Sequence, residues 1–158
     1  MANSNSITDW KDKAISRFLG NEEIIKALDV TDGEIEVGLT YTRIFPHLYI
    51  PDTTEETSSF INVEVDIPDI SDSGRWVYPQ LIVDVIVHQD KMQLDLNGVS
   101  ATRADYLSML VDDELNGSTD FGVGELLLVS NEAGSVNDKF RFRRLTFVAQ
   151  DINSSMCD

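Results

Sequence analysis

The sequence is poor in the residues that covalent and metal-based chemistry most often uses. Its 158 residues include one cysteine, Cys157, and two histidines, His47 and His88. A single cysteine cannot form an intrachain disulfide, and neither histidine lies at the spacing of a metal-ligand pair. A nucleophile elbow, a phosphate-binding loop and a dinucleotide fingerprint are all missing. We therefore expect no catalytic residues, no cofactor, no bound metal and no enzymatic activity.

Long apolar segments are missing as well. No run approaches the roughly 20 apolar residues that span a membrane, and the chain does not open with a basic segment followed by an apolar one. We expect a soluble protein, made in a reducing cytoplasm, with no membrane partner. The length suits one domain with a hydrophobic core. We assign this domain to residues 1–158, with residues 1–5 and 153–158 as flexible tails.

Positive charge is scarce. The chain has 28 Asp and Glu residues against 12 Lys and Arg, which gives a formal net charge of -16. Such a charge opposes tight wrapping of nucleic acid, because that binding depends on cations that contact phosphates. It is compatible with lining a passage through which DNA slides, and equally with simple solubility.

An apolar strand followed by an amphipathic helix forms the centre of the sequence. Residues 76–88 are rich in Val, Ile and Leu, which predicts a strand covered on at least one face. The helical spacing of apolar residues predicts a helix over 102–116 that covers this strand. The residues expected to pack on the sheet are Leu107, Leu110, Val111 and Leu115.

Two helices are predicted near the N-terminus. Ser6 with Asp9 resembles a capping box, and the helix that follows ends at Gly20. Asn21 is then placed to cap a second, shorter helix over residues 22–28, whose acidic first turn suits the helix dipole.

Turns and extended chain are predicted between these helices and the sheet. Asp32-Gly33 is typical of a turn, and residues 34–45 contain extended-looking segments. Pro46 and Pro51 keep the next segment extended and indicate an edge or an irregular crossing. Residues 52–59 are a polar loop.

The remaining strands indicate antiparallel pairing. Alternation over residues 60–68 predicts a half-exposed strand, and the last two strands form a hairpin joined by residues 131–138. The final strand changes its apolar register, so we expect a bulge near Arg143-Arg144. The predicted fold is α+β, with N-terminal helices, a mainly antiparallel central sheet and one helix packed on it. Its strands are expected at 60–68, 77–89, 125–130 and 139–150.

Carboxylates on neighbouring strands raise the question of a metal site. Glu64, Asp66 and Asp84 could share one face of the sheet and hold a hard cation. Nuclease sites with a similar pattern carry a lysine two positions after the second acid, and neither acidic strand here has one. A solvated strand face is the simpler interpretation.

Four of the twelve cations lie close together in an otherwise acidic chain. They are Lys139, Arg141, Arg143 and Arg144. An exposed strand face that aids solubility is one interpretation. The other is a contact surface for acidic residues of a neighbouring identical subunit, since arginine binds carboxylates well at interfaces. We predict that this cluster lies at a subunit boundary.

The order of these elements resembles that of bacteriophage tail-terminator and related neck (head–tail joining) proteins. The resemblance is one of layout and covers roughly residues 7–152. The segments that carry it are Arg43-Ile44-Phe45-Pro46 with Tyr49-Ile50-Pro51, the strand Leu81 to Gln89, Arg103-Ala104-Asp105-Tyr106-Leu107, Phe121-Gly122 with Leu127-Leu128-Val129-Ser130, and Arg144-Leu145-Thr146-Phe147.

This resemblance implies a small structural subunit without catalytic residues. Such subunits form a ring, typically six-membered, that caps the tail tube, meets the neck or connector proteins and surrounds the DNA channel. DNA would pass through the lumen without sequence-specific binding. The implied location is the tail or neck of the virion, after assembly in the cytoplasm of the bacterial host.

Other functions remain open at this point. The same layout suits another neck ring, such as a head-completion adaptor or a stopper. An acidic inhibitor that mimics DNA fits the net charge, although its acids would be dispersed among strands that build the core. A metal-dependent hydrolase depends only on the acidic strand face. The sequence does not distinguish contractile from non-contractile tails.

Overall fold

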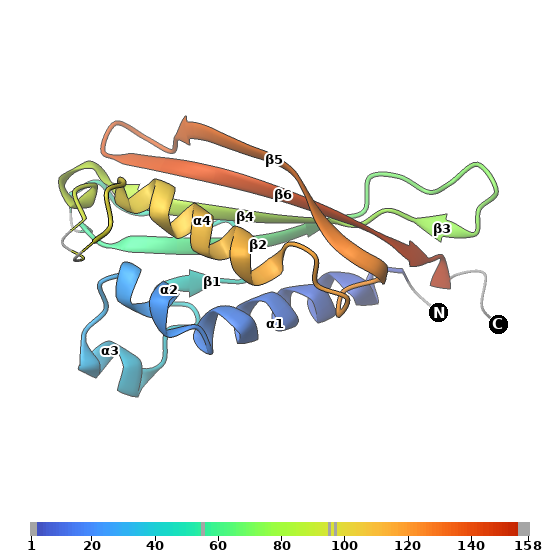
Figure 1. Ribbon diagram of the computed structural model, residues 1–158, viewed down its shortest axis with the longest axis horizontal. Coiled ribbons are helices and arrows are strands. Elements are labelled where there is room, and N and C mark those ends of the chain that lie inside the picture. Colours follow the sequence, from blue (N-terminus) through green and yellow to red (C-terminus); the bar gives the residue numbers. More distant parts are fainter. Residues whose placement is uncertain (1–2, 55, 95, 97, 155–158) are drawn as a thin grey trace.

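The computed structural model describes residues 3–54, 56–94, 96 and 98–154. It has the predicted α+β architecture, with α1 and α4 on one face of a six-stranded, mainly antiparallel sheet (Figure 1). The helices are α1 (Asn5–Leu19), α2 (Glu22–Ala27), α3 (Asp32–Val37) and α4 (Arg103–Leu115), with a 3-10 helix at Gln89–Lys91. The strands are β1 (Ile44–Phe45), β2 (Ser59–Asp66), β3 (Trp76–Val77), β4 (Gln80–His88), β5 (Val123–Ser135) and β6 (Phe140–Ile152).

The long strands form the body of the sheet. β4 pairs antiparallel with β2 on one side and with β6 on the other, and β5 pairs antiparallel with the far side of β6. β1 adds a short parallel pair beside β2, and β3 pairs with the last residues of β6. This order leaves β5 at an edge of the sheet.

The main core lies between the sheet and the helices. Trp10 and Phe18 of α1 are buried against the residues of β2, β4 and β6 that face the helices. Trp10 meets Phe121 edge to face, with 5.6 Å between the ring centroids, which is a preferred aromatic geometry. No helix in the described parts of the chain is long and apolar enough to cross a membrane.

The helix α4 packs on the sheet as predicted, with one difference. Thr102 caps it by accepting a hydrogen bond from the backbone N–H of Asp105 at 3.2 Å. Leu110 is only partly buried at the margin of the core, because it faces outward from the line of contact. The fully buried apolar residues of α4 are Leu107, Val111 and Leu115.

The opposite face of the sheet has its own apolar cluster. Phe60, Ile86 and Phe140 are buried there together with Phe45. The rings of Phe45 and Tyr49 stack with 4.1 Å between centroids, so the irregular crossing predicted from the two prolines covers part of this face.

The prediction of a bulge near Arg143-Arg144 was wrong. β6 pairs residue for residue with β4 from Phe140 to Val148, and the irregularities lie in β5, within residues 123–130. β6 carries apolar residues in both registers because each face of the sheet buries a different part of the strand. Phe140, at the start of β6, belongs to the second cluster, whereas Leu145 and Phe147, later in the strand, belong to the main core.

The predicted strand over 77–89 is divided into two strands. β3 ends at Val77 and β4 begins at Gln80, with Pro79 in the gap, where a residue without an N–H is tolerated. The final hairpin is longer than predicted, because β5 continues to Ser135 where a link over 131–138 was expected.

Near the N-terminus, α1 begins earlier than the predicted cap. It starts at Asn5, and Ser4 at the N-cap position makes no side-chain hydrogen bond, so the capping role assigned to Ser6 was wrong. The predicted cap of α2 is confirmed, since the Asn21 side chain accepts from the N–H groups of Glu23 and Ile24.

The turn predicted at Asp32-Gly33 was also wrong. These residues open α3, and residues 34–37 are helical rather than extended. Thr31 and Glu34 form a reciprocal capping box, which satisfies two backbone donors at the start of the helix.

The two ends of the described chain lie together (Figure 1). Asn3 Nδ2 donates to Asn153 Oδ1 at 2.8 Å, and the backbone N–H of Ser154 donates to Asn3 Oδ1 at 2.6 Å. Cys157 lies outside the described residues.

Candidate functional site

The basic cluster predicted to form a subunit interface is divided between the two faces of the sheet. Arg141 and Arg143 lie in the register that faces the helices, opposite Val87 and Val85 of β4. Arg144 lies in the other register, directly opposite Asp84. The four cations therefore do not form one patch.

Two of these cations bind carboxylates within the chain. Arg144 donates through Nε and Nη2 to the two carboxylate oxygens of Asp84, at 2.8 and 2.9 Å. This hydrogen bonding raises the pKa of Arg144 above its ordinary value, although partial burial opposes the shift. On the other face, Arg143 Nε donates to Asp105 Oδ1 at 2.9 Å.

Lys139 and Arg141 have no carboxylate partner among the described residues. Arg141 Nη1 donates to backbone oxygens at the tip of the β5–β6 hairpin, including that of Asn137 at 3.1 Å. These contacts hold the guanidinium in place but leave its charge uncompensated. The positive site of the strand is therefore its hairpin end.

The hairpin end adjoins an open strand edge. The first half of β5 is covered, because the N–H of Leu126 donates to Ser118 O and that of Leu128 donates to Asn116 Oδ1. Within the described chain, no such bond covers residues 129–135 on their outer edge. Val129 there is 60% exposed. We call residues 129–135 with Lys139 and Arg141 the hairpin surface.

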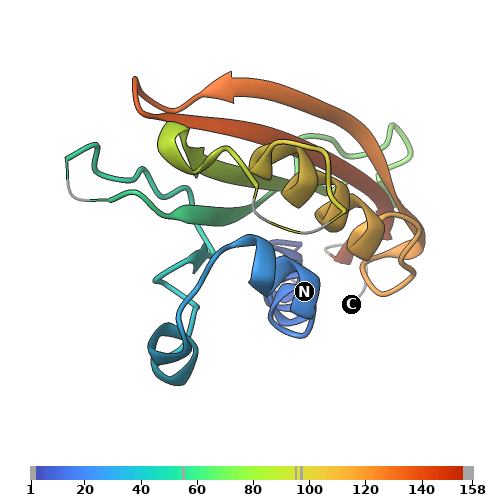
Figure 2. The ribbon, with the colours of Figure 1, turned by 60° about the vertical axis from the view of Figure 1, so that its left-hand side comes forward.

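A second exposed surface surrounds α3, which buries none of its own residues. Ile35 is 50% exposed and Val37 is 84% exposed, beside Leu19 and Tyr41, which are also exposed. Figure 2 shows α3 projecting from the body of the molecule, on the side away from β5.

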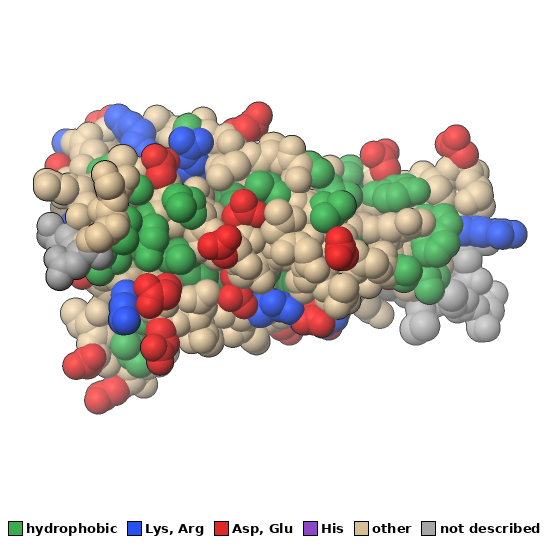
Figure 3. Space-filling model, viewed as in Figure 1, with side chains coloured by type: hydrophobic (Ala, Val, Ile, Leu, Met, Phe, Trp, Pro, Cys, Tyr) green, Lys and Arg blue, Asp and Glu red, His purple; other side chains and the backbone are tan. Residues whose placement is uncertain are grey.

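This projection is acidic as well as apolar. The side chains of Asp29, Asp32 and Glu36 are exposed and form no ion pair with a described residue. Acidic side chains gather over α3 in the space-filling view (Figure 3). We call α3 with Asp29, Leu19 and Tyr41 the arm surface.

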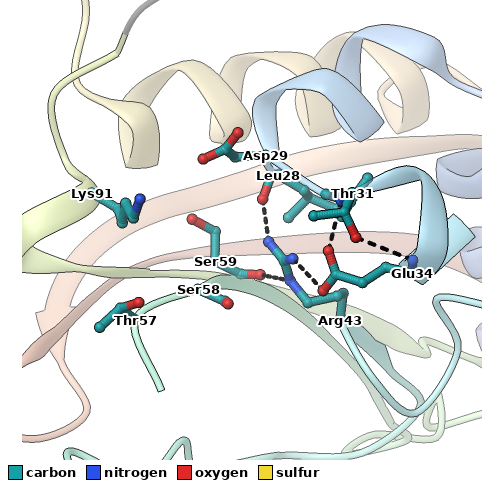
Figure 4. A pocket seen from close by; sticks show the side chains of 10 residues that line it. Leu28, Asp29, Thr31, Glu34, Arg43, Thr57, Ser58, Ser59 and Lys91 are labelled. Atoms are coloured by element: carbon teal, nitrogen blue, oxygen red, sulfur yellow. Dashed lines mark hydrogen bonds and ion pairs between the residues drawn. The ribbon is translucent and has the colours of Figure 1, made fainter. Parts of the chain in front are cut away.

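A buried arginine anchors this arm. Arg43 is 4% exposed, and its Nε donates to Ser59 O at 2.7 Å while Nη1 donates to Glu34 Oε1 at 2.9 Å (Figure 4). Nη2 donates to the backbone oxygen of Leu28. The guanidinium thus ties the start of β2, the end of α2 and the helix α3 to one another.

Glu34 joins the anchor to the helix cap. Its carboxylate accepts from the backbone N–H of Thr31 at 2.7 Å and from Arg43. The hydrogen bond from Thr31 is the main reason that the pKa of Glu34 is lowered. Burial opposes this shift, and the hydrogen bond and charge of Arg43 lower the pKa further.

These residues line an open pocket of about 410 Å³ that also contains Lys91 (Figure 4). All three donating groups of Arg43 are bound inside the chain, so they serve the fold rather than a ligand. Sequence reasoning missed this anchor. The Thr31-x-x-Glu34 spacing, which matches a capping box, was the signal that could have revealed α3.

The three carboxylates considered as a metal site share one face of the sheet but do not converge. None of Glu64, Asp66 and Asp84 is a cross-strand partner of another. Asp84 binds Arg144, and Glu64 pairs with Lys11 at 2.5 Å. No group of three His, Cys, Asp or Glu side chains among the residues that the structure describes is arranged to hold a metal ion.

The two histidines have different surroundings. His88 is buried, and its Nδ1 accepts from the backbone N–H of Asp90 at 3.1 Å. Its ring meets Phe140 edge to face. His47 is exposed beside Phe45. His88 is therefore held within the fold by packing and a hydrogen bond.

Comparisons with known proteins give the following. The model of the YomW family matches residues 12–149 of the chain. No curated protein matches the sequence. A chain in a solved structure described as "Virion of native gene transfer agent (GTA) particle" is 21% identical, with 81% of this chain and 90% of that chain covered and a TM-score of 0.46.

Proposed function

This chain belongs to the YomW family, a phage-related family, and we propose that it is a structural protein of a phage virion. More narrowly, it forms a ring at the head-proximal end of the tail, as a tail terminator or a neck joining protein. The observation that carries this proposal is the pair of exposed surfaces on opposite sides of the subunit. An open strand edge and an exposed apolar surface make a free monomer prone to aggregation. A subunit of a ring, in contrast, needs two different contact surfaces.

The order of the elements supports the same proposal. Helices at the N-terminus, an irregular crossing, two long strands, a helix opened by Thr102 and Arg103, and a long closing hairpin follow one another along the chain. This is the layout in which the sequence resembles tail-terminator and neck proteins. The partners that we propose are further copies of the chain, typically six in a ring, together with tail-tube and neck proteins.

The charge of the subunit suits a DNA channel. With a net charge of -16, a ring of such subunits repels the phosphate backbone, so DNA can slide through without sequence-specific binding. The same charge makes the subunits repel one another. Assembly then needs local complementarity, and we propose that Lys139 and Arg141, the cations of the cluster without a carboxylate partner among the described residues, supply it at a subunit boundary.

Another ring of the neck, such as an adaptor or a stopper, would use the same surfaces and differs only in its position in the particle.

A DNA-mimic inhibitor needs a continuous display of free carboxylates. Several acids here are bound by cations of the same chain, among them Asp84, Asp105 and Glu114. The structure therefore favours an assembly subunit over a mimic.

The test is to locate the protein in particles. Phage particles are purified from cells that express the chain with an epitope tag, and the tag is found by mass spectrometry and by immunogold electron microscopy. We expect gold at one end of the tail, at the junction with the head. A chain that is missing from purified particles, or that labels the whole tail, contradicts the proposal.

A further inference from the structure

We propose that the arm surface of one copy binds the hairpin surface of the next copy. This inference depends on the proposed function, because it specifies how the subunits of the ring meet. It assigns the acidic partner of the basic strand to α3, a helix that was not expected from the sequence.

Charge is the first argument. Residues 29–36 contain four acidic residues and no Lys or Arg, whereas residues 138–144 contain four cations and one acid. Three of those acids, Asp29, Asp32 and Glu36, and two of those cations, Lys139 and Arg141, have no oppositely charged partner among the described residues. The two surfaces therefore carry opposite charges that the subunit itself leaves uncompensated.

Position is the second argument. α3 and the tip of the β5–β6 hairpin lie at the same end of the long axis of the molecule (Figure 1), but α3 is at the bottom and the hairpin at the top in both views (Figures 1 and 2). The arm of a subunit cannot reach its own hairpin, so only another copy can bring the two charges together. A contact between two different surfaces is head-to-tail, and it closes into a ring when the rotation permits.

Apolar contact is the third argument. Val37 and Ile35 on the arm are the kind of exposed side chains that gain from burial. Across the proposed contact, residues 129–135 offer Val129 and an uncovered strand edge whose only charged side chain is Glu132. Edges that must avoid other chains usually carry more charge than this.

The arm is rigid enough to act as a contact. Arg43 and the capping box of Thr31 and Glu34 hold α3 in one orientation, although no apolar side chain of α3 is buried in the subunit. A helix kept in place by polar bonds, with its apolar residues outside, is prepared for a partner.

Charge reversal across the contact tests the inference. The variants are Glu36→Arg on the arm, Arg141→Glu on the hairpin, and the double variant. The control is Arg75→Glu, because Arg75 is exposed beside β3, at the far end of the molecule from both surfaces (Figure 1). Self-association is measured by sedimentation velocity and negative-stain microscopy, and folding by circular dichroism.

We expect wild type and Arg75→Glu to assemble alike, and each single variant to associate about tenfold more weakly or worse, since like charges then face each other. The double variant should recover assembly, because the reversed charges are again opposite. An equimolar mixture of the two single variants should also recover it. In the mixture, the basic arm of one variant meets the acidic hairpin of the other, and the unchanged arm and hairpin meet as in wild type.

Three results overturn the inference. One is a wild-type protein that stays monomeric. Another is single variants that are folded and assemble as wild type does. The third is a loss of assembly in both single variants that neither the mixture nor the double variant restores. This outcome is distinguishable from a failure of the proposed function. The protein can form rings that respond to the charge reversal and still be missing from purified particles.

Discussion

Arg144 and Asp84 face each other across β6 and β4 and form a bidentate ion pair on the sheet face away from the helices. The Asp84 side chain is 5% exposed, and the Arg144 side chain is 42% exposed. The arginine therefore covers a buried carboxylate in the middle of the sheet and is itself partly exposed to the solvent.

Removing this cover should destabilise the protein. In Arg144→Met the Asp84 carboxylate loses two charge-assisted hydrogen bonds, and we expect the free energy of unfolding to fall by about 1.5–3 kcal/mol. Urea denaturation measures the change, with Arg75→Met as the control at an exposed arginine. A loss below about 0.5 kcal/mol, which is usual for ordinary surface sites, would contradict this role.

Two leucines of α4 should differ in their contribution to stability. Leu107 is fully buried, so Leu107→Ala should cost about 2–5 kcal/mol in thermal or urea unfolding. Leu110 is partly buried, and its truncation should cost less than half of that amount, because part of its surface already contacts water. Equal losses in the two variants would mean that Leu110 is more enclosed than the structure indicates.

The arm should loosen at acidic pH. The pKa of Glu34 is lowered in the folded protein, so its stabilising effect is present above the ordinary pKa of 4.5 and is lost as the pH falls through the lowered value. Backbone chemical shifts of α3, followed by NMR through this range, should move toward unfolded values. Glu34→Gln should lack this pH-dependent step, and a wild-type α3 that stays helical below it contradicts the prediction.

One glycine should resist replacement for a steric reason. A Cβ atom on Gly122 would lie 2.5 Å from the backbone oxygen of Gln150, so Gly122→Ala should destabilise the protein by about 1–3 kcal/mol. Gly33 in α3 is the matched comparison, because a Cβ there would lie no closer than 3.9 Å to Thr31 Oγ1. Gly33→Ala should be neutral or slightly stabilising in the same denaturation assay.

Local patterns in the sequence predicted most of the regular elements. The apolar spacing that ends at Leu115 predicted α4, and the alternation after Phe60 predicted β2, because both signals depend on periods of 3.6 and 2 residues. The side chain of Asn21 at a helix start was likewise enough to predict a cap. Net charge and the missing motif set were also readable from composition alone.

The wrong predictions of secondary structure arose where two local signals conflicted, or where a residue distant in the sequence determined the local structure. Asp32-Gly33 is typical of a turn, yet the capping box of Thr31 and Glu34 and the bond from Arg43 stabilise a helix there. The double register of β6 suggested a bulge, because the sequence does not show that both faces of a sheet can be covered at different places along one strand.

The sequence by itself determined the α+β class, the acidic surface and the concentration of cations in residues 139–144. Only the tertiary structure decided which cations remain free, because Asp84 and Asp105 lie far from Arg144 and Arg143 in sequence and reach them through strand pairing and helix packing. It also decided that α3 projects on the side of the molecule opposite the hairpin. Contacts between residues that are far apart in the sequence depend on how the elements pack, and a local sequence pattern does not show which elements pack together.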